Sequence, residues 1–281
     1  MKKNSKIKFV YLENNLIPEN QAFISPNHRG FLYGDGLFES CRFIDKKIIN
    51  FDAHINRLER GAKYLQIKIP SKPKLLQICQ DLIDRNNDKF GIVRISVSRG
   101  IGSLGYLPLS SCKPLIFIET KQPAPTPKNQ NLIICDYNPP QFNFKTSNSI
   151  PYILAKKFAE KNGYFDSIML DKNYKICETS SANIFWIKDK IIYTPSDDCD
   201  IIYGTIRESL FSIKELKIIS GKYDLSSIKE ADEVFITNSN LVLMPVEKIA
   251  FRNKKNFYEI NFKKILVKKV LKLLKIKLHL I

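Results

Sequence analysis

Lys145 is one residue of this sequence that could carry covalent chemistry. It stands among Phe142, Phe144 and Ile150, and an apolar environment lowers the pKa of a lysine because it disfavours the charged ammonium. A neutral lysine amine can form an imine with an aldehyde or move a proton at a reacting carbon. Because lysines are abundant throughout the chain, these neighbours alone do not distinguish Lys145 from a solvated surface amine.

Metal chemistry has few candidate ligands in this chain. The three histidines, His28, His54 and His279, are not paired at ligand spacing, so a zinc site has little to be built from. The six cysteines are irregularly spaced and form no Cys-x-x-Cys pair. This pattern favours free thiols in a reducing compartment over a disulfide framework. We therefore expect no metal and a cytoplasmic protein.

The formal net charge of +17 favours anionic partners, such as nucleic acids, membrane surfaces and small phosphorylated or carboxylated ligands. Lysine and isoleucine are abundant everywhere, and the aromatic-interleaved basic motifs of RNA-binding sheets are absent. We therefore expect a small anionic substrate rather than nucleic acid. We expect no secretory signal, and because the sequence has no apolar run of about 18 residues, we expect no transmembrane segment.

The proline-rich segment 122–128 divides the chain nearly in half. The candidate functional residues must therefore be positioned by the elements of two regions. Alternating prolines enforce an extended conformation, which is typical of a linker. We expect a small α+β domain over residues 1–121 and a larger domain over residues 129–281. In the first region, apolar runs predict strands, and two helical patterns lie among them: strands at 8–12, 36–43, 91–97 and 115–119, and helices at 54–65 and 75–86.

The second region predicts mainly antiparallel strands, in an arrangement like a barrel, because its apolar runs are short and separated by turn signals. The expected elements are strands at 131–136, 167–171, 183–188 and 191–194 and a helix at 153–161. The final segment, 262–281, has apolar residues at helical spacing and lysines elsewhere. We favour a terminal helix docked on its domain; the alternative is a basic amphipathic helix on anionic lipid.

Five segments combine glycines, hydroxyl residues and charged residues in a fixed order along the chain: Arg29-Gly-Phe-Leu-Tyr-Gly-Asp-Gly-Leu-Phe-Glu39, His54-Ile-Asn-Arg57-Leu58, Lys145-Thr-Ser-Asn148, Glu178 through Arg207, and Ala231-Asp-Glu233 leading to Met244-Pro245-Val246. Together they resemble the signature of class IV aminotransferases, also called fold-type IV PLP enzymes. The resemblance covers nearly the whole chain. It implies a two-domain α+β fold with a β-barrel-like second domain, a pyridoxal 5′-phosphate (PLP) cofactor and a homodimer.

The resemblance implies roles for three charged residues. Lys145 would form the Schiff base with the cofactor and, once released by substrate, would act as the acid and base that moves protons. Glu178 would keep the pyridine nitrogen of the cofactor protonated, so that the ring accepts electrons. Arg57 would supply the cation that binds the phosphate.

The same resemblance implies further contacts to the phosphate. Gly204-Thr205-Ile206 is similar to the anion-binding turn that the family has at a helix start, where the amides of Thr205 and Ile206 would converge on the anion. The commoner order has an aliphatic residue after the glycine and threonine next, so here the hydroxyl stands one position earlier. Ser239 stands in a second loop, at a position where the family often has a hydroxyl.

Within the family, three segments resemble 4-amino-4-deoxychorismate lyases: Ser98 through Tyr106, which is similar to a glycine-rich loop of the small domain, Ala182 through Trp186, and Asn238 leading to Met-Pro-Val. Leu104 and Tyr106 stand where D-amino-acid aminotransferases have an Arg-x-His triplet that binds a carboxylate. They are therefore candidate substrate-binding residues in a chain that lacks this trap.

Two departures favour an aminotransferase instead. Leu104 stands where lyases often have arginine, and Glu39 is shared with branched-chain enzymes, as a substrate-binding or a structural carboxylate. We expect a lyase of folate biosynthesis that converts 4-amino-4-deoxychorismate to 4-aminobenzoate and pyruvate. The alternatives are a class IV aminotransferase acting on branched-chain or D-amino acids and, from a different class, a non-catalytic basic protein that binds nucleic acid.

Overall fold

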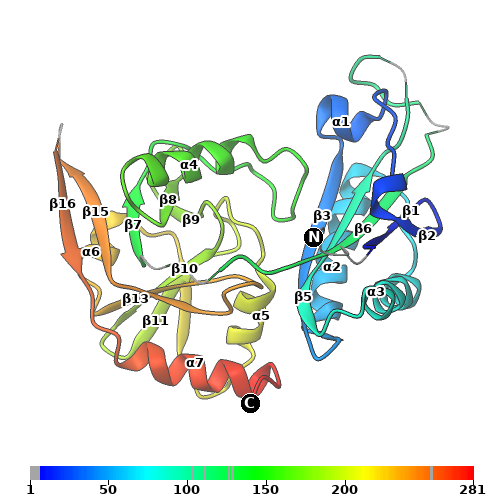
Figure 1. Cartoon of the computed structure of the whole chain (residues 1–281). Coiled ribbons are helices and arrows are strands. Elements are labelled where there is room, and N and C mark those ends of the chain that lie inside the picture. Colours follow the sequence, from blue (N-terminus) through cyan, green and yellow to red (C-terminus); the bar gives the residue numbers. More distant parts are fainter. Residues whose placement is uncertain (1–6, 103, 110–111, 126, 128–129, 254–255) are drawn as a thin grey trace, which may run out of the picture. The chain divides into compact units, whose positions relative to one another are not determined.

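The computed structural model describes the chain except for residues 1–6, 103, 110–111, 126, 128–129 and 254–255. The chain forms two compact units (Figure 1). Unit 1 comprises Met1–Ala124 and Phe144–Asn148, and unit 2 comprises Pro125–Asn143 and Ser149–Ile281. The segment around Lys145 thus packs with unit 1, although it follows the proline-rich segment in the sequence. Thr126 and Lys128 of the expected linker lie outside the described residues.

Unit 1 is built on a six-stranded sheet of order β2-β1-β6-β5-β3-β4, in which every pairing is antiparallel. The strands are β1 (Phe9–Leu12), β2 (Asn15–Pro18), β3 (Gly36–Ile44), β4 (Lys47–Ile48), β5 (Phe90–Ser98) and β6 (Leu115–Lys121). Strands β3 and β5 alternate buried and half-buried side chains, because successive residues of a strand point to opposite faces. The four strands predicted from apolar runs are confirmed within one or two residues.

Two helices of unit 1, α2 (Phe51–Leu65) and α3 (Lys72–Asn86), pack against this sheet (Figure 1). Both were predicted, with their starts placed three residues too late. The short helices η1 (Glu19–Gln21) and α1 (Arg29–Tyr33) precede β3. Buried side chains such as Cys41 and Ile95 lie on the helix side of the sheet, so half-buried Phe38 and Ser96 lie on the face away from α2 and α3.

The segment 144–148 runs beside the start of β3. The Phe38 amide donates to the Lys145 carbonyl at 3.1 Å, and the Ser147 amide donates to the Gly36 carbonyl at 2.9 Å. Gly36 permits this approach, because a Cβ there would lie 3.1 Å from Ser147 Oγ, and it would also lie 2.6 Å from the Val97 carbonyl oxygen of β5. Lys145 is therefore held at the backbone by the sheet of unit 1.

Unit 2 contains two five-stranded sheets, of order β12-β11-β10-β13-β14 and β16-β15-β7-β8-β9. The strands are β7 (Asn131–Ile134), β8 (Asp166–Leu170), β9 (Ile176–Thr179), β10 (Asn183–Lys188), β11 (Ile191–Pro195), β12 (Ile218–Gly221), β13 (Glu233–Thr237), β14 (Met244–Val246), β15 (Lys248–Asn253) and β16 (Asn256–Asn261). Ile184 and Trp186 of the first sheet share a core with Ile168 and Phe251 of the second. The predicted α+β class is confirmed.

Most strand pairs of unit 2 are antiparallel, as predicted, but three are parallel: β11 with β12, and β7 with both β8 and β15. The helices are α4 (Ile150–Lys161), α5 (Thr205–Phe211), α6 (Leu225–Lys229) and α7 (Leu266–Lys277). Helix α4 begins three residues earlier than predicted and connects β7 to its parallel neighbour β8 (Figure 1). Such a crossover is the usual route between adjacent parallel strands.

The C-terminal helix α7 docks on unit 2, which confirms the prediction of a terminal helix packed against its domain. Val267, Val270 and Leu274 are buried, and the lysines of α7 are exposed or half-buried. The Glu233 carboxylate of β13 accepts the amides of Leu266 and Val267 at 2.8 and 2.9 Å, which satisfies donors that a helix start otherwise leaves unpaired. Among the helices in the described part of the chain, none is both long and apolar enough to cross a bilayer.

Candidate cofactor and substrate site

Lys145 is half-buried in unit 1, and its Nζ lies 5.1 Å from the centroid of the Phe38 ring. Two of the three sequence neighbours, Phe144 and Ile150, do not supply the apolar environment predicted for it. Phe144 is buried on the opposite side of the segment, where its ring packs against Gly61, and Ile150 of unit 2 is 63% exposed. Because side chains alternate along an extended segment, the apolar partner of Lys145 comes from β3 instead.

Arg57 of α2 forms a buried bidentate ion pair with Glu39 of β3. Its Nε and Nη2 donate to the two carboxylate oxygens at 2.7 Å each, a geometry that fixes the plane of a guanidinium. His54, one turn earlier on α2, places Nδ1 at 2.7 Å from the same carboxylate. Glu39 is 1% exposed. This position supports the structural role of Glu39 over the substrate-binding one.

Burial and charge act in opposite directions on this cluster. Burial tends to raise the pKa of Glu39, but the Arg57 charge and hydrogen bonds from Arg57 and His54 outweigh it, so the pKa lies well below its usual value. Burial lowers the pKa of His54, although the Glu39 carboxylate opposes that shift. At neutral pH the cluster is therefore a Glu39 anion, an Arg57 cation and a neutral His54.

Glu178 of β9 is a buried carboxylate of unit 2 that accepts hydrogen bonds from Tyr152, Ile202 and Asn183. Tyr152 Oη donates at 2.8 Å, the Ile202 amide at 3.1 Å and Asn183 Nδ2 at 3.2 Å. Burial, followed by the nearby Glu178 charge, raises the pKa of Tyr152, so its hydroxyl remains a donor at ordinary pH. Donors to a carboxylate favour its charged form. Glu178 therefore fits a protonated ring nitrogen, and Tyr152 is a partner that the sequence did not reveal.

Asp166 of β8 organises the turn that follows Glu178. Its buried carboxylate accepts the Ser167 amide at 2.8 Å, the Thr179 hydroxyl at 3.0 Å and the Ser181 hydroxyl at 2.5 Å, and it also accepts the Ser180 hydroxyl. The turn thus held joins β9 to β10. Sequence reasoning missed Asp166, since nothing in the local pattern links it to hydroxyls more than ten positions further along.

Gly204 begins the turn into α5. A Cβ at this position would collide with the Asn183 amide, so the close approach requires glycine. Thr205 and Ile206 open the helix, where backbone amides lack intrahelical partners and can bind an anion. Ile206 is 3% exposed, so its side chain is buried within unit 2 and any contact with an anion would come from its amide. The Thr205 and Ser239 hydroxyls lie 3.4 Å apart, which brings the two predicted phosphate loops together within unit 2.

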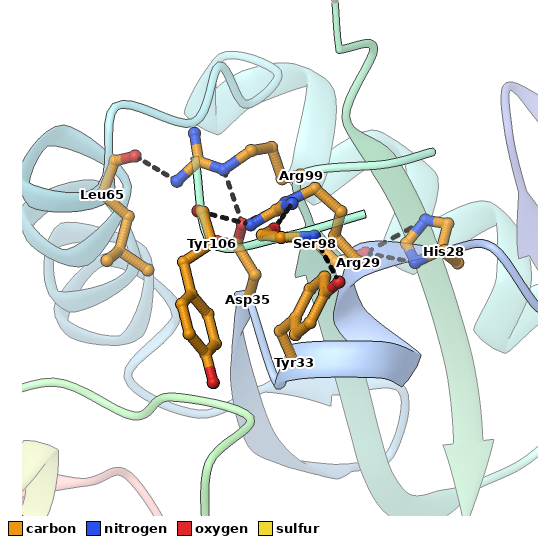
Figure 2. Close-up of polar contacts among 9 residues, drawn as sticks. His28, Arg29, Tyr33, Asp35, Leu65, Ser98, Arg99 and Tyr106 are labelled. Atoms are coloured by element: carbon orange, nitrogen blue, oxygen red, sulfur yellow. Dashed lines mark hydrogen bonds and ion pairs between the residues drawn. The ribbon is translucent and has the colours of Figure 1, made fainter. Parts of the chain in front are cut away.

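The loop that carries Leu104 and Tyr106 is held through its backbone (Figure 2). Arg29 donates to the carbonyls of Gly105 and Tyr106 at 2.8 and 2.9 Å, and the Gly105 amide donates to the Tyr33 hydroxyl at 2.8 Å. The side chains of Leu104 and Tyr106 are 86% and 89% exposed. They are available to a ligand or partner. Ser103 of this loop lies outside the described residues.

Asp35 fixes the base of the same loop. Its Oδ2 accepts Arg29 Nε at 2.9 Å and Arg99 Nε at 2.7 Å, and Arg99 also donates to the Leu65 carbonyl at 2.7 Å (Figure 2). Burial tends to raise the pKa of Asp35, but hydrogen bonds from the two arginines lower it below the usual value. Both guanidinium groups are thus engaged in holding the loop.

The predicted site residues fall into two sets. Unit 1 holds Lys145, Arg57, Glu39, Leu104 and Tyr106, and unit 2 holds Glu178, Thr205, Ile206 and Ser239. Unit 2 contains Glu178, a carboxylate that suits a protonated ring nitrogen. It also contains groups that suit a phosphate, namely the amides of Thr205 and Ile206 and the Ser239 hydroxyl. The residues therefore fit the cofactor that the sequence motifs imply.

Comparison with known proteins agrees with these motifs. A family model described as amino-transferase class IV matches residues 36–249. Aminodeoxychorismate lyase of Bacillus subtilis is 32% identical over 252 residues, covering 85% of this chain and 86% of the lyase. A protein of Methanocaldococcus jannaschii with the provisional name branched-chain-amino-acid aminotransferase is 30% identical over 270 residues, covering 90% and 93%. A D-alanine aminotransferase of Listeria monocytogenes is 26% identical over 252 residues, covering 85% and 87%.

The fold agrees as well. The branched-chain aminotransferase of Thermoproteus uzoniensis, solved with norvaline, superposes with a TM-score of 0.87 at 20% identity, covering 98% of this chain and 96% of that one. The family inferred from the five sequence segments is confirmed by the family model and by the relative from Bacillus subtilis. The chain belongs to the class IV aminotransferases and is a PLP-dependent enzyme of that family.

Proposed function

We propose that this enzyme is an aminodeoxychorismate lyase, which converts 4-amino-4-deoxychorismate to 4-aminobenzoate and pyruvate in folate biosynthesis. The observation that carries the proposal is the 32% identity with the Bacillus subtilis lyase over 85% of the chain. The Leu104-Gly105-Tyr106 sequence supports it, because neither exposed side chain can supply the Arg-x-His carboxylate trap of D-amino-acid aminotransferases.

PLP, when bound, supplies an electron-accepting ring that stabilises the negative charge left by removal of a proton from the substrate. Lys145 would hold the cofactor and, once displaced by the substrate amine, take the proton from C4 of the substrate ring. Loss of the enolpyruvyl group then breaks the C–O bond and makes the ring aromatic. Lys145 would return the proton to the leaving group, which is released as pyruvate.

Other residues of the chain would hold the cofactor. Glu178, kept anionic by its three donors, would keep a proton on the pyridine nitrogen. Arg57, whose guanidinium plane is fixed by its two hydrogen bonds to Glu39, would bind the phosphate. The amides of Thr205 and Ile206 and the Ser239 hydroxyl would also bind it.

The second candidate is an aminotransferase that acts on branched-chain or D-amino acids. The relatives named as aminotransferases favour it, and Lys145 would then take the proton from the α-carbon of the amino acid. A non-catalytic nucleic-acid-binding protein is no longer a useful alternative, since the family is one of enzymes.

We further propose a homodimer, which sedimentation equilibrium tests directly.

The experiment is incubation of the PLP-loaded protein with enzymatically generated 4-amino-4-deoxychorismate, following 4-aminobenzoate fluorescence. A parallel assay offers leucine or D-alanine with 2-oxoglutarate. We expect 4-aminobenzoate, no such product with Lys145→Ala, and full product with Lys157→Ala, which alters an exposed lysine of α4. Glutamate formation without 4-aminobenzoate would show that the enzyme is an aminotransferase.

A further inference from the structure

Unit 1 contains a pocket of about 480 Å³ on the sheet face away from α2 and α3. Its floor is formed by the paired ends of β5 and β6, where Ser96 faces Phe117 and Ser98 faces Leu115. The loop before α1 contributes apolar walls at Ile24 and Phe31. The pocket is thus a mixed cavity, apolar at its sides and hydroxylic along its floor.

Four serines line this pocket: Ser25, Ser96, Ser98 and Ser147. The Ser98 hydroxyl lies 3.3 Å from the ring nitrogens of buried His28 (Figure 2). Within the part of the chain that the structure describes, the hydroxyls of Ser96 and Ser147 form no hydrogen bond. Hydroxyls that line a cavity without protein partners are placed to bind oxygen or nitrogen groups of a ligand.

The pocket adjoins the reactive lysine. Lys145 and Ser147 lie two residues apart on the extended segment beside β3, so their side chains point to the same side. Ser147 Oγ lies beside Gly36, and the Lys145 amine lies over Phe38, two positions further along β3. A molecule attached to or attacked by Lys145 can therefore extend over β3 towards Ser147 and Ser96.

Positive charge lies at the edge of the pocket rather than within it. Arg94, two positions before Ser96 on β5, stacks its guanidinium 4.0 Å from the Phe38 centroid. Burial lowers the pKa of His28, an effect that Glu13 partly opposes, so the imidazole is neutral at neutral pH. An anionic ligand is thus attracted along the rim, while its contacts on the floor are made by neutral hydroxyls.

We propose that this pocket, which we call the serine pocket, receives the oxygen-bearing ring of the substrate and selects cyclic, carboxylated or hydroxylated substrates over amino acids with aliphatic side chains. This inference rests on the proposed function and extends it by naming the residues that recognise the ring. An aliphatic side chain in the serine pocket would strip water from the hydroxyls and offer no hydrogen bond in return, which disfavours its binding.

The test is calorimetric titration of the PLP-loaded enzyme with two monocarboxylates, 4-aminobenzoate and 4-methylvalerate. The first is cyclic and polar, and the second is aliphatic. We expect 4-aminobenzoate to bind more tightly to the wild type. Ser96→Ala and Ser147→Ala should each weaken 4-aminobenzoate binding by about fivefold, the value of one ordinary hydrogen bond. Neither should weaken 4-methylvalerate binding, because loss of a hydroxyl removes the cost of stripping its water. Ser227→Ala, on α6 of unit 2, is the matched control and should change neither affinity.

Two results would overturn the inference: tighter binding of 4-methylvalerate than of 4-aminobenzoate by the wild type, or unchanged 4-aminobenzoate affinity in both pocket variants. Thermal unfolding of each variant shows whether it is folded, and both altered side chains are small and half-buried or exposed. Failure of the proposed function is seen separately. It would appear as wild-type protein that makes no 4-aminobenzoate from 4-amino-4-deoxychorismate, whatever the titrations give.

Discussion

The Glu39 carboxylate and the Arg57 guanidinium form two buried hydrogen bonds of 2.7 Å, with neither side chain more than 3% exposed. An ion pair taken out of water is sensitive to the loss of one partner, because the other charge is left buried without compensation. The pair also links β3 to α2, so it couples the sheet of unit 1 to the arginine that we expect to bind phosphate.

Replacing Glu39 by glutamine should therefore destabilise the protein by roughly 3–5 kcal/mol, since Arg57 would lose its counter-charge. Urea unfolding measures this directly. The control is Asp84→Asn, which removes an exposed pair with Lys46 and should cost less than about 1 kcal/mol. Equal losses in the two variants would show that the Glu39–Arg57 pair contributes no more than a surface contact.

The same cluster predicts a pH dependence of stability. The pKa of His54 is lowered in the folded protein, so below about pH 6.5 the unfolded chain binds a proton that the folded chain does not. Stability should then fall as the pH falls below that value, by up to about 1.4 kcal/mol per pH unit for each such histidine. Buried His28 should act in the same direction.

Glu39 extends this dependence to lower pH. Its pKa is also lowered on folding, so its contribution is present above about pH 4.5 and is lost as the pH falls further. Denaturant unfolding at pH 7.5, 6, 5 and 4 measures both effects. His54→Gln should flatten the curve between pH 6.5 and 5, and an unchanged curve in that variant would contradict the assignment.

Asp166→Asn should disturb the turn between β9 and β10. The Asp166 carboxylate now accepts hydrogen bonds from the Ser167 backbone amide and from the hydroxyls of Thr179 and Ser181. Asparagine keeps one acceptor oxygen but has an NH2 group in place of the other, so at least one of these donors loses its acceptor. We expect a loss of about 2 kcal/mol in stability and weaker PLP binding, measured by fluorescence titration. Asp224→Asn is the control, because this exposed residue caps α6 and asparagine caps a helix as well.

Tyr152→Phe removes the 2.8 Å hydrogen bond from the Tyr152 hydroxyl to Glu178. We expect turnover of the PLP-loaded enzyme to fall by roughly tenfold to a hundredfold, the value of one hydrogen bond to a charged group. Tyr164→Phe removes a 2.7 Å hydrogen bond to exposed Glu259 and should leave turnover unchanged. A loss of activity in both variants would indicate a general effect of removing tyrosine hydroxyls rather than a role at Glu178.

Glu233→Gln tests the docking of the C-terminal helix. The carboxylate accepts two amides at the start of α7 and interacts favourably with the helix dipole. Glutamine retains one acceptor and no charge, so we expect a loss of about 1 kcal/mol. Chemical labelling of the α7 lysines during unfolding would show whether this helix is released before the rest of unit 2.

The strands and helices that follow local periodicity were predictable from the sequence. The alternation along β3 and β5 and the helical spacing in α2, α3 and α7 each depend on residues a few positions apart. The parallel pairings of β7 could not be predicted in this way, because they join segments separated by a helix or by more than a hundred residues. Periodicity says which face of a strand is apolar, but it does not say which strand lies beside it.

The sequence by itself determined the residue types on which the chemistry depends, with Lys145, Glu178 and Gly204 recognisable in segments of fixed order. Only the tertiary structure decided what surrounds them. It turned Phe144 away from Lys145 and put Phe38 in its place, and it gave Glu178 a hydrogen bond from Tyr152. The physical reason is that pKa values and hydrogen bonds depend on distances in space, and these distances are fixed by contacts between segments far apart in the chain.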